Sequence, residues 1–131
     1  MVTFDKNIWV RYLTNDDEAQ AQRAMRLLEQ SEAVYIPKTV LLELEWVLRA
    51  AYRIKPDIIH RSLLQILGLP MVTVESAGQV ASALVYFAQG CDFADALHLA
   101  SSDSAEIVFT FDEKFISNAK HAAPTVKAVP E

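Results

Sequence analysis

The chain has 131 residues, a length that allows one domain with a buried core and is short for two. Hydrophobic residues make up 52% and charged residues 22%, which excludes a disordered or fibrous chain and is typical of a compact globular protein. There is no apolar run of membrane-spanning length, no visible secretion leader and only one cysteine, Cys91. We therefore expect a cytoplasmic protein with no membrane partner.

The first half of the chain alternates short β-type runs with helical patterns. In chain order, the sequence predicts a strand at residues 2–4, helices at 7–13 and 18–30, a strand at 34–36, and helices at 39–51 and 55–67. Pro37 ends the second strand, and Pro56 fits the first turn of the last of these helices.

The second half continues the alternation. It predicts a strand at 71–74, helices at 76–89 and 92–104, a buried strand at 107–111, a short helix starting at Asp112 and an edge strand at 125–128. There is no internal repeat, low-complexity tract or linker. Strands that alternate with helices favour a parallel sheet covered on both faces. The prediction is one α/β domain over residues 1–131, a three-layer α/β/α sandwich.

Two aspartates directly follow predicted strands. Asp5 comes after the first strand and Asp112 after the strand at 107–111. Ligands of open α/β sheets bind beyond the carboxyl ends of the strands, so we expect both carboxylates at one edge of the sheet. The alternative for each is a helix N-cap, a position that aspartate also favours.

Glu43 interrupts an apolar pattern in the helix at 39–51. The stripe formed by Ile36, Val40, Val47 and Ala50 predicts that Glu43 faces the interior, whereas Glu45 lies on another face and is expected in solvent. A buried carboxylate requires compensation, for which a metal ion serves well. The alternative is an ion pair with Arg49 or another base.

Asp92 and Asp95 are three residues apart at the start of a helix and so share one face. One interpretation is a cap at Asp92 with Asp95 placed favourably in the helix dipole. However, the helix that follows is largely apolar, which directs Asp95 toward the edge of the core. His98, one turn beyond Asp95, could support the site without binding the metal, although such a histidine is more often simply packed. Cys91 is expected to be buried and inert.

These acids give four or five carboxylates at one edge of the sheet, with no thiol-rich zinc pattern, phosphate-binding glycine loop or Ser–His system. Oxygen ligands select Mg²⁺ or Mn²⁺, and such a site suits phosphodiester hydrolysis. The net charge of −5 is compatible with a polyanionic substrate. Setting aside the five candidate acids (Asp5, Glu43, Asp92, Asp95 and Asp112) leaves twelve acids against twelve Lys and Arg, nine of which lie at or before Arg61.

Four segments in order resemble the PIN domain, and more specifically VapC-type toxins. They are FDKNIWVRYL at residues 4–13, VLLELEWVL at 40–48, DFADALHLA at 92–100 and TFD at 110–112. The likeness runs over nearly the whole chain at family-like spacing. It implies a sheet of four or five parallel strands in the order 3-2-1-4-5 and an endoribonuclease that depends on Mg²⁺ or Mn²⁺. It also implies an RNA substrate, a homodimer and a cognate antitoxin.

The same resemblance assigns roles to the acids. Asp5, Glu43, Asp95 and Asp112 match the family's catalytic quartet, and Asp92 matches a further acid frequent in this subgroup. Asp5, Asp95 and Asp112 are then expected metal ligands together with Asp92. Glu43 could bind the metal through water and help to deprotonate the nucleophile.

One residue departs from the pattern, because Lys6 stands where the family usually has Thr or Ser. Its ammonium could pair with Asp5 or Asp112 and displace the metal, or it could contact the scissile phosphate. The first rival function is therefore a PIN-like protein that binds RNA or antitoxin without cleavage. The second is aspartyl-phosphate chemistry, which fits poorly. A receiver domain needs Asp at Glu75, and the corresponding phosphatases need Asp at Asn7.

Overall fold

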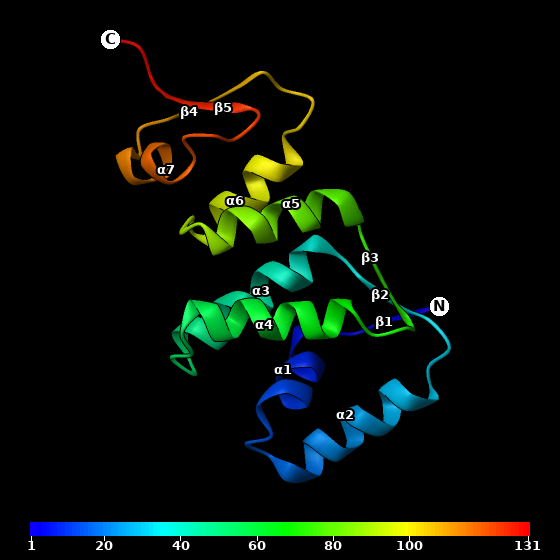
Figure 1. The fold of residues 1–131 in the computed structure, drawn as a ribbon. Helices are drawn as coiled ribbons and strands as arrows, with labels where there is room; N and C mark the ends of the chain where they lie inside the picture. Colours follow the sequence, from blue (N-terminus) through cyan, green and yellow to red (C-terminus); the bar gives the residue numbers. More distant parts are fainter. The chain divides into compact units, whose positions relative to one another are not determined.

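The structure is a computed structural model that describes residues 1–131 (Figure 1). Its helices are α1 (Lys6–Thr14), α2 (Glu18–Gln30), α3 (Lys38–Ala50), α4 (Pro56–Leu67), α5 (Ala77–Ala88), α6 (Phe93–Ser101) and α7 (Glu113–Asn118). Its strands are β1 (Val2–Thr3), β2 (Val34–Ile36), β3 (Val72–Val74), β4 (Ile107–Thr110) and β5 (Thr125–Ala128). No helix combines the length and apolar character needed to cross a membrane.

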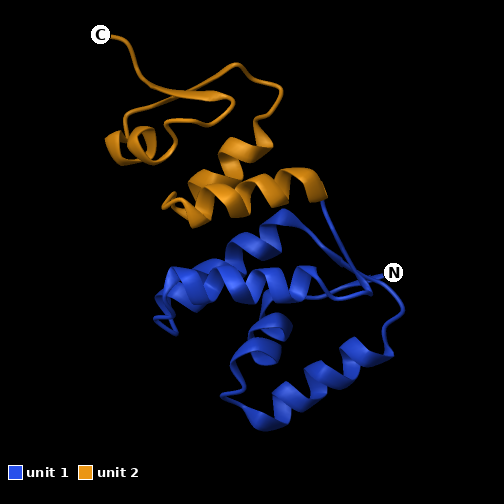
Figure 2. Cartoon of the chain, viewed as in Figure 1, with its two compact units in different colours: residues 1–75 blue, residues 76–131 orange.

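The chain forms two compact units, residues 1–75 and 76–131, which Figure 2 colours separately. Unit 1 holds α1 to α4 and a parallel sheet in the order β1-β2-β3, and unit 2 holds α5 to α7 and the parallel pair β4-β5. The predicted α/β class with parallel strands is confirmed. That both units act as one domain stays a prediction.

The expectation of a single four- to five-stranded sheet is wrong for this structure, which has sheets of three and two strands. Within these sheets the neighbours of the expected order 3-2-1-4-5 are confirmed as β3-β2-β1 and β4-β5. The strand lengths give the physical reason. β1 consists of only Val2 and Thr3, which pair with Val34 and Tyr35 of β2. All four residues of β4 pair with β5. The ladder hydrogen bonds are thus made within two separate sheets.

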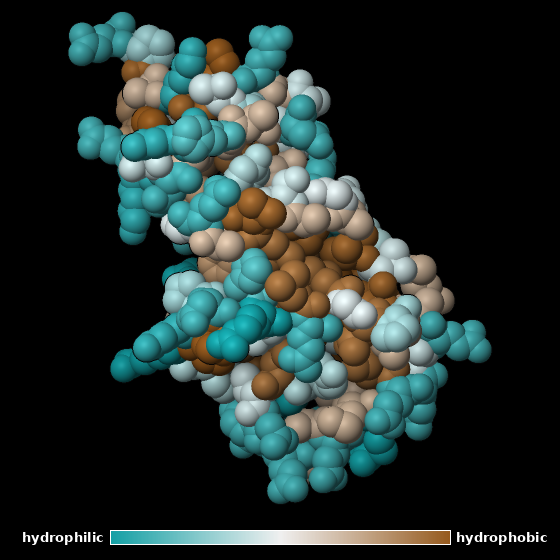
Figure 3. All heavy atoms as spheres, in the orientation of Figure 1, coloured by the Kyte–Doolittle hydropathy of each residue, from teal (hydrophilic) through white to brown (hydrophobic).

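The core of unit 1 lies around β2 and the inner faces of its helices. Val34 and Ile36 of β2 are fully buried. Helix α3 buries Leu41, Leu44 and Leu48, a spacing that places them on one helical face. The fully buried residues of α4 are Ile59, Leu63 and Ile66. By contrast, hydrophilic side chains cover most of the visible surface around α2 (Figure 3), whose buried residues are confined to Ala21, Ala24 and Leu28.

In unit 2, α5 and α6 pack against each other through aromatic rings. Phe87 and Phe93 meet edge to face with their centroids 5.3 Å apart. Between these helices the backbone turns at Gly90, whose φ of 109° favours glycine. The Asn118 side-chain amide donates to the Gly90 carbonyl at 3.1 Å. This tight turn fixes where Asp92 begins α6.

Two elements of unit 2 differ from their predictions. α6 ends at Ser101 instead of residue 104, and the hydroxyl of Ser102 donates to the His98 carbonyl at 2.8 Å. Such a local bond competes with continuation of the helix. β4 was expected to be buried, but Ile107 and Phe109 are exposed and only Val108 is buried. Its alternating pattern therefore buries one face only.

Candidate functional site

Asp5 lies immediately after β1 and is the N-cap of α1. Its Oδ1 accepts a hydrogen bond from the Asn7 backbone N–H at 3.0 Å. The neighbouring Phe4 is buried and its ring packs against Trp9, so the backbone entering the cap is anchored. The capping alternative is confirmed for Asp5. Because the bond uses Oδ1 alone, Oδ2 is left for another ligand.

Glu43 is exposed, which overturns the prediction that it faces the interior. Its side chain is 53% exposed, and its Oε2 pairs with the Lys6 Nζ at 3.2 Å. The sequence pattern misled because α3 has apolar residues on more than one face. The face that is buried runs through Leu41, Leu44 and Leu48, one position away from the stripe chosen around Glu43.

Glu45 was expected in solvent and is instead the buried charged residue of the molecule. It is 2% exposed, and the Arg49 Nε donates to its Oε2 at 2.9 Å. The partner that the sequence proposed for Glu43 is therefore the partner of Glu45. This pair compensates a buried charge within α3 and leaves Glu43 available for other contacts.

Glu75 is an acid at this edge of the sheet to which sequence reasoning gave no role. It directly follows β3, and its Oε1 accepts from the Lys38 backbone N–H at 3.0 Å. Pro37, the N-cap of α3, provides no side-chain cap, so Glu75 supplies one from a neighbouring strand. The signal was present in the sequence, because Glu75 follows a strand just as Asp5 and Asp112 do.

Lys6 pairs with an acid of the predicted quartet, but not with the acids expected. The expected partners were Asp5 or Asp112, and the observed one is Glu43. The reason is local: Lys6 occupies the first turn of α1, and α1 packs against α3, which carries Glu43. The ammonium thus lies within the candidate site and opposes the charge of one of its acids.

Asp92 and Asp95 open α6 in unit 2. Asp92 occupies the N-cap position, but its side chain makes no capping hydrogen bond, so the capping interpretation is wrong for Asp92. Asp95 lies in the first helical turn and is half-buried. It forms no ion pair or hydrogen bond.

Asp112 follows β4 and is the N-cap of α7. Its Oδ1 accepts from the backbone N–H groups of Lys114 at 3.0 Å and Phe115 at 3.1 Å. The Asp112 N–H donates to the Thr110 Oγ1 at 3.0 Å, which holds the turn between strand and helix. The capping alternative is confirmed here too, and again Oδ1 alone makes the capping bonds.

The acids of unit 2 affect one another electrostatically. Burial raises the pKa of Asp95, the negative charges of Asp92 and Asp112 raise it further, and only His98 acts in the opposite direction. Burial and the charges of Asp95 and Asp92 also raise the pKa of the Cys91 thiol. Cys91 is buried, as predicted, and its raised pKa disfavours a reactive thiolate.

The family of the chain gives these acids their context. The PIN domain model matches residues 2–121. The chain belongs to the PIN-domain family. No curated protein and no solved structure matches it. PIN domains are generally nucleases that use a divalent metal, so their substrates are nucleic acids.

The acids of this PIN domain suit such a metal in their chemistry but do not form a closed site. No three Asp, Glu, His or Cys side chains come together closely enough to hold a metal ion in this structure. The chemistry of the donors nevertheless fits, because all are carboxylates, which hard cations prefer. Asp95 is half-buried, is repelled by two other acids and has no cationic partner among the ion pairs. A divalent cation would relieve that repulsion.

Proposed function

We propose that this PIN domain is a metal-dependent endoribonuclease that hydrolyses RNA phosphodiester bonds. The catalytic residues of the proposal are Asp5, Glu43, Asp95 and Asp112. The observation that carries it is the position of Asp95, a half-buried acid in the first turn of α6 that forms no ion pair and is repelled by Asp92 and Asp112. Unfavourable electrostatics of this kind are typical of sites that bind cations.

Asp5, Asp92, Asp95 and Asp112 would hold Mg²⁺ or Mn²⁺. When bound, such a cation supplies positive charge that favours attack on a phosphodiester. The capping hydrogen bonds of Asp5 and Asp112 would orient their carboxylates before any ligand arrives. Glu43 would accept a proton from the attacking water once Lys6 releases its Oε2.

The finer proposal is that the chain is the toxin of a type II toxin–antitoxin system, acting in the cytoplasm as a homodimer. Its support is the resemblance of the four motifs to VapC-type toxins. A cognate antitoxin would then block the nuclease. Co-expression with the adjacent gene product, followed by size-exclusion chromatography with light scattering, tests both the partner and the dimer.

The nuclease itself is tested with Asp95→Asn. We expect the parent protein to cleave RNA with Mn²⁺ and to stop when chelator is added. The variant should be inactive both with Mn²⁺ and with chelator. Glu106→Gln is the matched control, because it removes one exposed acid of the same unit that lies outside the four motifs. Cleavage that survives chelator or Asp95→Asn would contradict the proposal.

A second candidate function is a PIN-like domain that binds RNA or antitoxin without cutting. The ion pair between Lys6 and Glu43 favours this reading, because it already occupies one acid of the quartet. The two functions differ in their metal response. A silenced site would leave the melting temperature unchanged on addition of Mn²⁺, whereas a nuclease site would raise it.

A further inference from the structure

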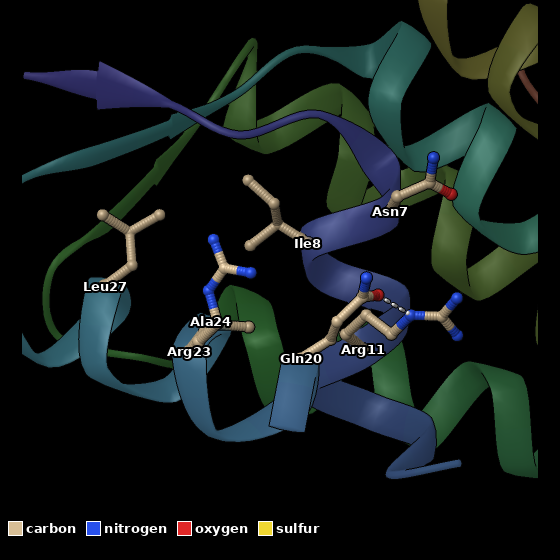
Figure 4. Close-up of a pocket in the computed structure, with 7 residues that line it drawn as sticks. All are labelled: Asn7, Ile8, Arg11, Gln20, Arg23, Ala24 and Leu27. Carbon is tan, nitrogen blue, oxygen red and sulfur yellow. Dashed lines mark hydrogen bonds between the residues drawn. The ribbon is translucent and has the colours of Figure 1, made fainter. Parts of the chain in front are cut away.

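A groove lies between α1 and α2 in unit 1, lined by residues to which the proposed catalysis gives no role (Figure 4). Its volume is about 440 Å³, within the roughly 300–1,000 Å³ of ligand-binding clefts. Ile8, Ala24 and Leu27 form its apolar lining, and no acidic side chain lines it. The groove therefore contains no carboxylate that would repel an anion.

One of the two arginines of the groove is already engaged. The Arg11 Nε donates to the Gln20 Oε1 at 2.6 Å, and its Nη1 bonds to Asp16 at 3.0 Å and to the Tyr52 hydroxyl at 3.1 Å. In Figure 4 the Arg11 guanidinium points away from Ile8, toward this network. Arg11 therefore joins α1 to α2 and forms one wall of the groove.

Arg23 is the unbalanced charge. It forms no ion pair, and in Figure 4 its guanidinium points into the space beside Ile8 and Leu27. The residues one helical turn away on α2 include no acid that could neutralise it; they are Ala19, Gln20, Arg26 and Leu27. A planar guanidinium with free donors beside an apolar lining suits an anion attached to a less polar body, as in a nucleotide.

The groove begins beside an acid of the candidate site. Asn7 lines it, and the Asn7 backbone N–H donates the hydrogen bond by which the Asp5 side chain caps α1. An RNA strand that is cleaved near Asp5 would have its flanking nucleotides within reach of this groove, because the lining residues Asn7, Ile8 and Arg11 follow Asp5 on α1.

We propose that the α1–α2 groove binds single-stranded RNA next to the cleaved bond, with Arg23 contacting a backbone phosphate. This deepens the proposed nuclease function and rests on it. An acidic peptide would also satisfy Arg23. RNA is favoured because the groove starts beside Asp5. It is also favoured because four of the seven lining residues are polar or cationic (Asn7, Arg11, Gln20 and Arg23), which suits ribose and phosphate better than a helix with a broad apolar face.

The test measures binding without cleavage. Fluorescence anisotropy with a labelled single-stranded RNA in chelator should show that Arg23→Gln weakens binding about three- to tenfold. The slope of log affinity against log salt should fall by about 0.7, as expected for one lost phosphate contact on a single strand. Arg26→Gln is the control, since it removes the same charge from α2 outside the groove lining, and it should change binding less than twofold.

A second variant probes the apolar lining. Leu27→Glu introduces an acid into the groove at a position 41% exposed, where folding should tolerate it, and should weaken RNA binding more than tenfold. Equal losses for Arg23→Gln and Arg26→Gln would overturn the proposal, as would absence of RNA binding by the parent protein at low salt. If the parent protein binds a poly-glutamate peptide, and Arg23→Gln loses this binding while its RNA binding is unchanged, the groove would be assigned to a protein partner instead.

These outcomes are separate from those of the nuclease test. If Asp95→Asn leaves cleavage intact while Arg23→Gln weakens RNA binding, the catalytic assignment fails and the groove proposal stands. If Asp95→Asn abolishes cleavage while both arginine variants bind RNA like the parent, the catalytic assignment stands and the groove proposal fails.

Discussion

Replacing Lys6 by threonine removes the cation paired with Glu43 and introduces the hydroxyl that PIN-domain resemblance leads one to expect. The structure limits how strongly this lysine can oppose a metal. The pair is 3.2 Å long, and its side chains are 29% and 53% exposed, so solvent screens it substantially. Ion pairs of this kind contribute about 0.2–1 kcal/mol.

That magnitude decides between weakening and silencing. A cation that recruits Glu43 must break a pair worth at most about 1 kcal/mol, which corresponds to roughly a fivefold loss of affinity. Lys6 should therefore weaken the metal site without abolishing it. In chelator, Lys6→Thr should lower the melting temperature by no more than about 5 °C. Its affinity for Mn²⁺ should rise by up to about fivefold.

The assay is a Mn²⁺ titration followed by thermal unfolding. Lys6→Gln separates loss of charge from gain of a hydroxyl, and Lys55→Gln removes an exposed lysine elsewhere in unit 1. Lys6→Thr and Lys6→Gln should both shift the titration to lower Mn²⁺, and Lys55→Gln should not. An increase above a hundredfold would show that Lys6 silences the site. Identical titrations for all four proteins would show that Lys6 does not compete with metal.

Three further predictions follow from the other acids. Because the folded-state pKa of Asp95 is raised, by burial and then by neighbouring acids, the stability it contributes is present below the unfolded pKa and lost as pH rises through the raised value. Urea unfolding in chelator should show that loss for the parent and not for Asp95→Asn; parallel pH curves would contradict it. Asp112→Ala should cost about 0.5–2 kcal/mol by removing a cap, whereas Asp112→Asn should keep the cap and cost less, and both should reduce the Mn²⁺ response. Equal destabilisation by the two would disprove the capping role. A double-mutant cycle on Glu45 and Arg49 should give a coupling of about 1.5–3 kcal/mol, toward the lower value because Arg49 is 44% exposed; a coupling under about 0.5 kcal/mol would refute the pairing.

The sequence predicted most elements because their signals are local. The acids that follow β1 and β4 cap the next helix through hydrogen bonds to near neighbours, and the fixed φ of Pro56 suits the first turn of α4. Such bonds are visible in the order of residues. The partition of the strands between two sheets depends instead on which backbone edges pair, and short runs such as Val2–Thr3 contain little information about their partner.

The interior face of α3 could not be read from periodicity alone. Leu42 and Trp46 are exposed although they are large and apolar, and Leu44 and Leu48 are buried. With apolar residues around most of the helix, two stripes fit a period of 3.6 about equally well, and the choice placed Glu43 inside and Glu45 outside. What decides the face is packing against α1 and α4, which lies outside the helix's own sequence.

Helix capping and metal binding are compatible roles for Asp5 and Asp112. In each residue Oδ1 accepts the backbone N–H bonds, while Oδ2 makes none. A cap fixes the side-chain torsions, so a cation would meet a carboxylate whose orientation is already determined. Asp95 differs, because it has no hydrogen bond to stabilise its charge and its pKa is raised. The capped acids thus have a structural reason to be present without metal, whereas the ionised form of Asp95 is favoured within the chain only by His98, against burial and the charges of Asp92 and Asp112. Asp95 is accordingly the residue whose substitution separates a metal site from a set of helix caps.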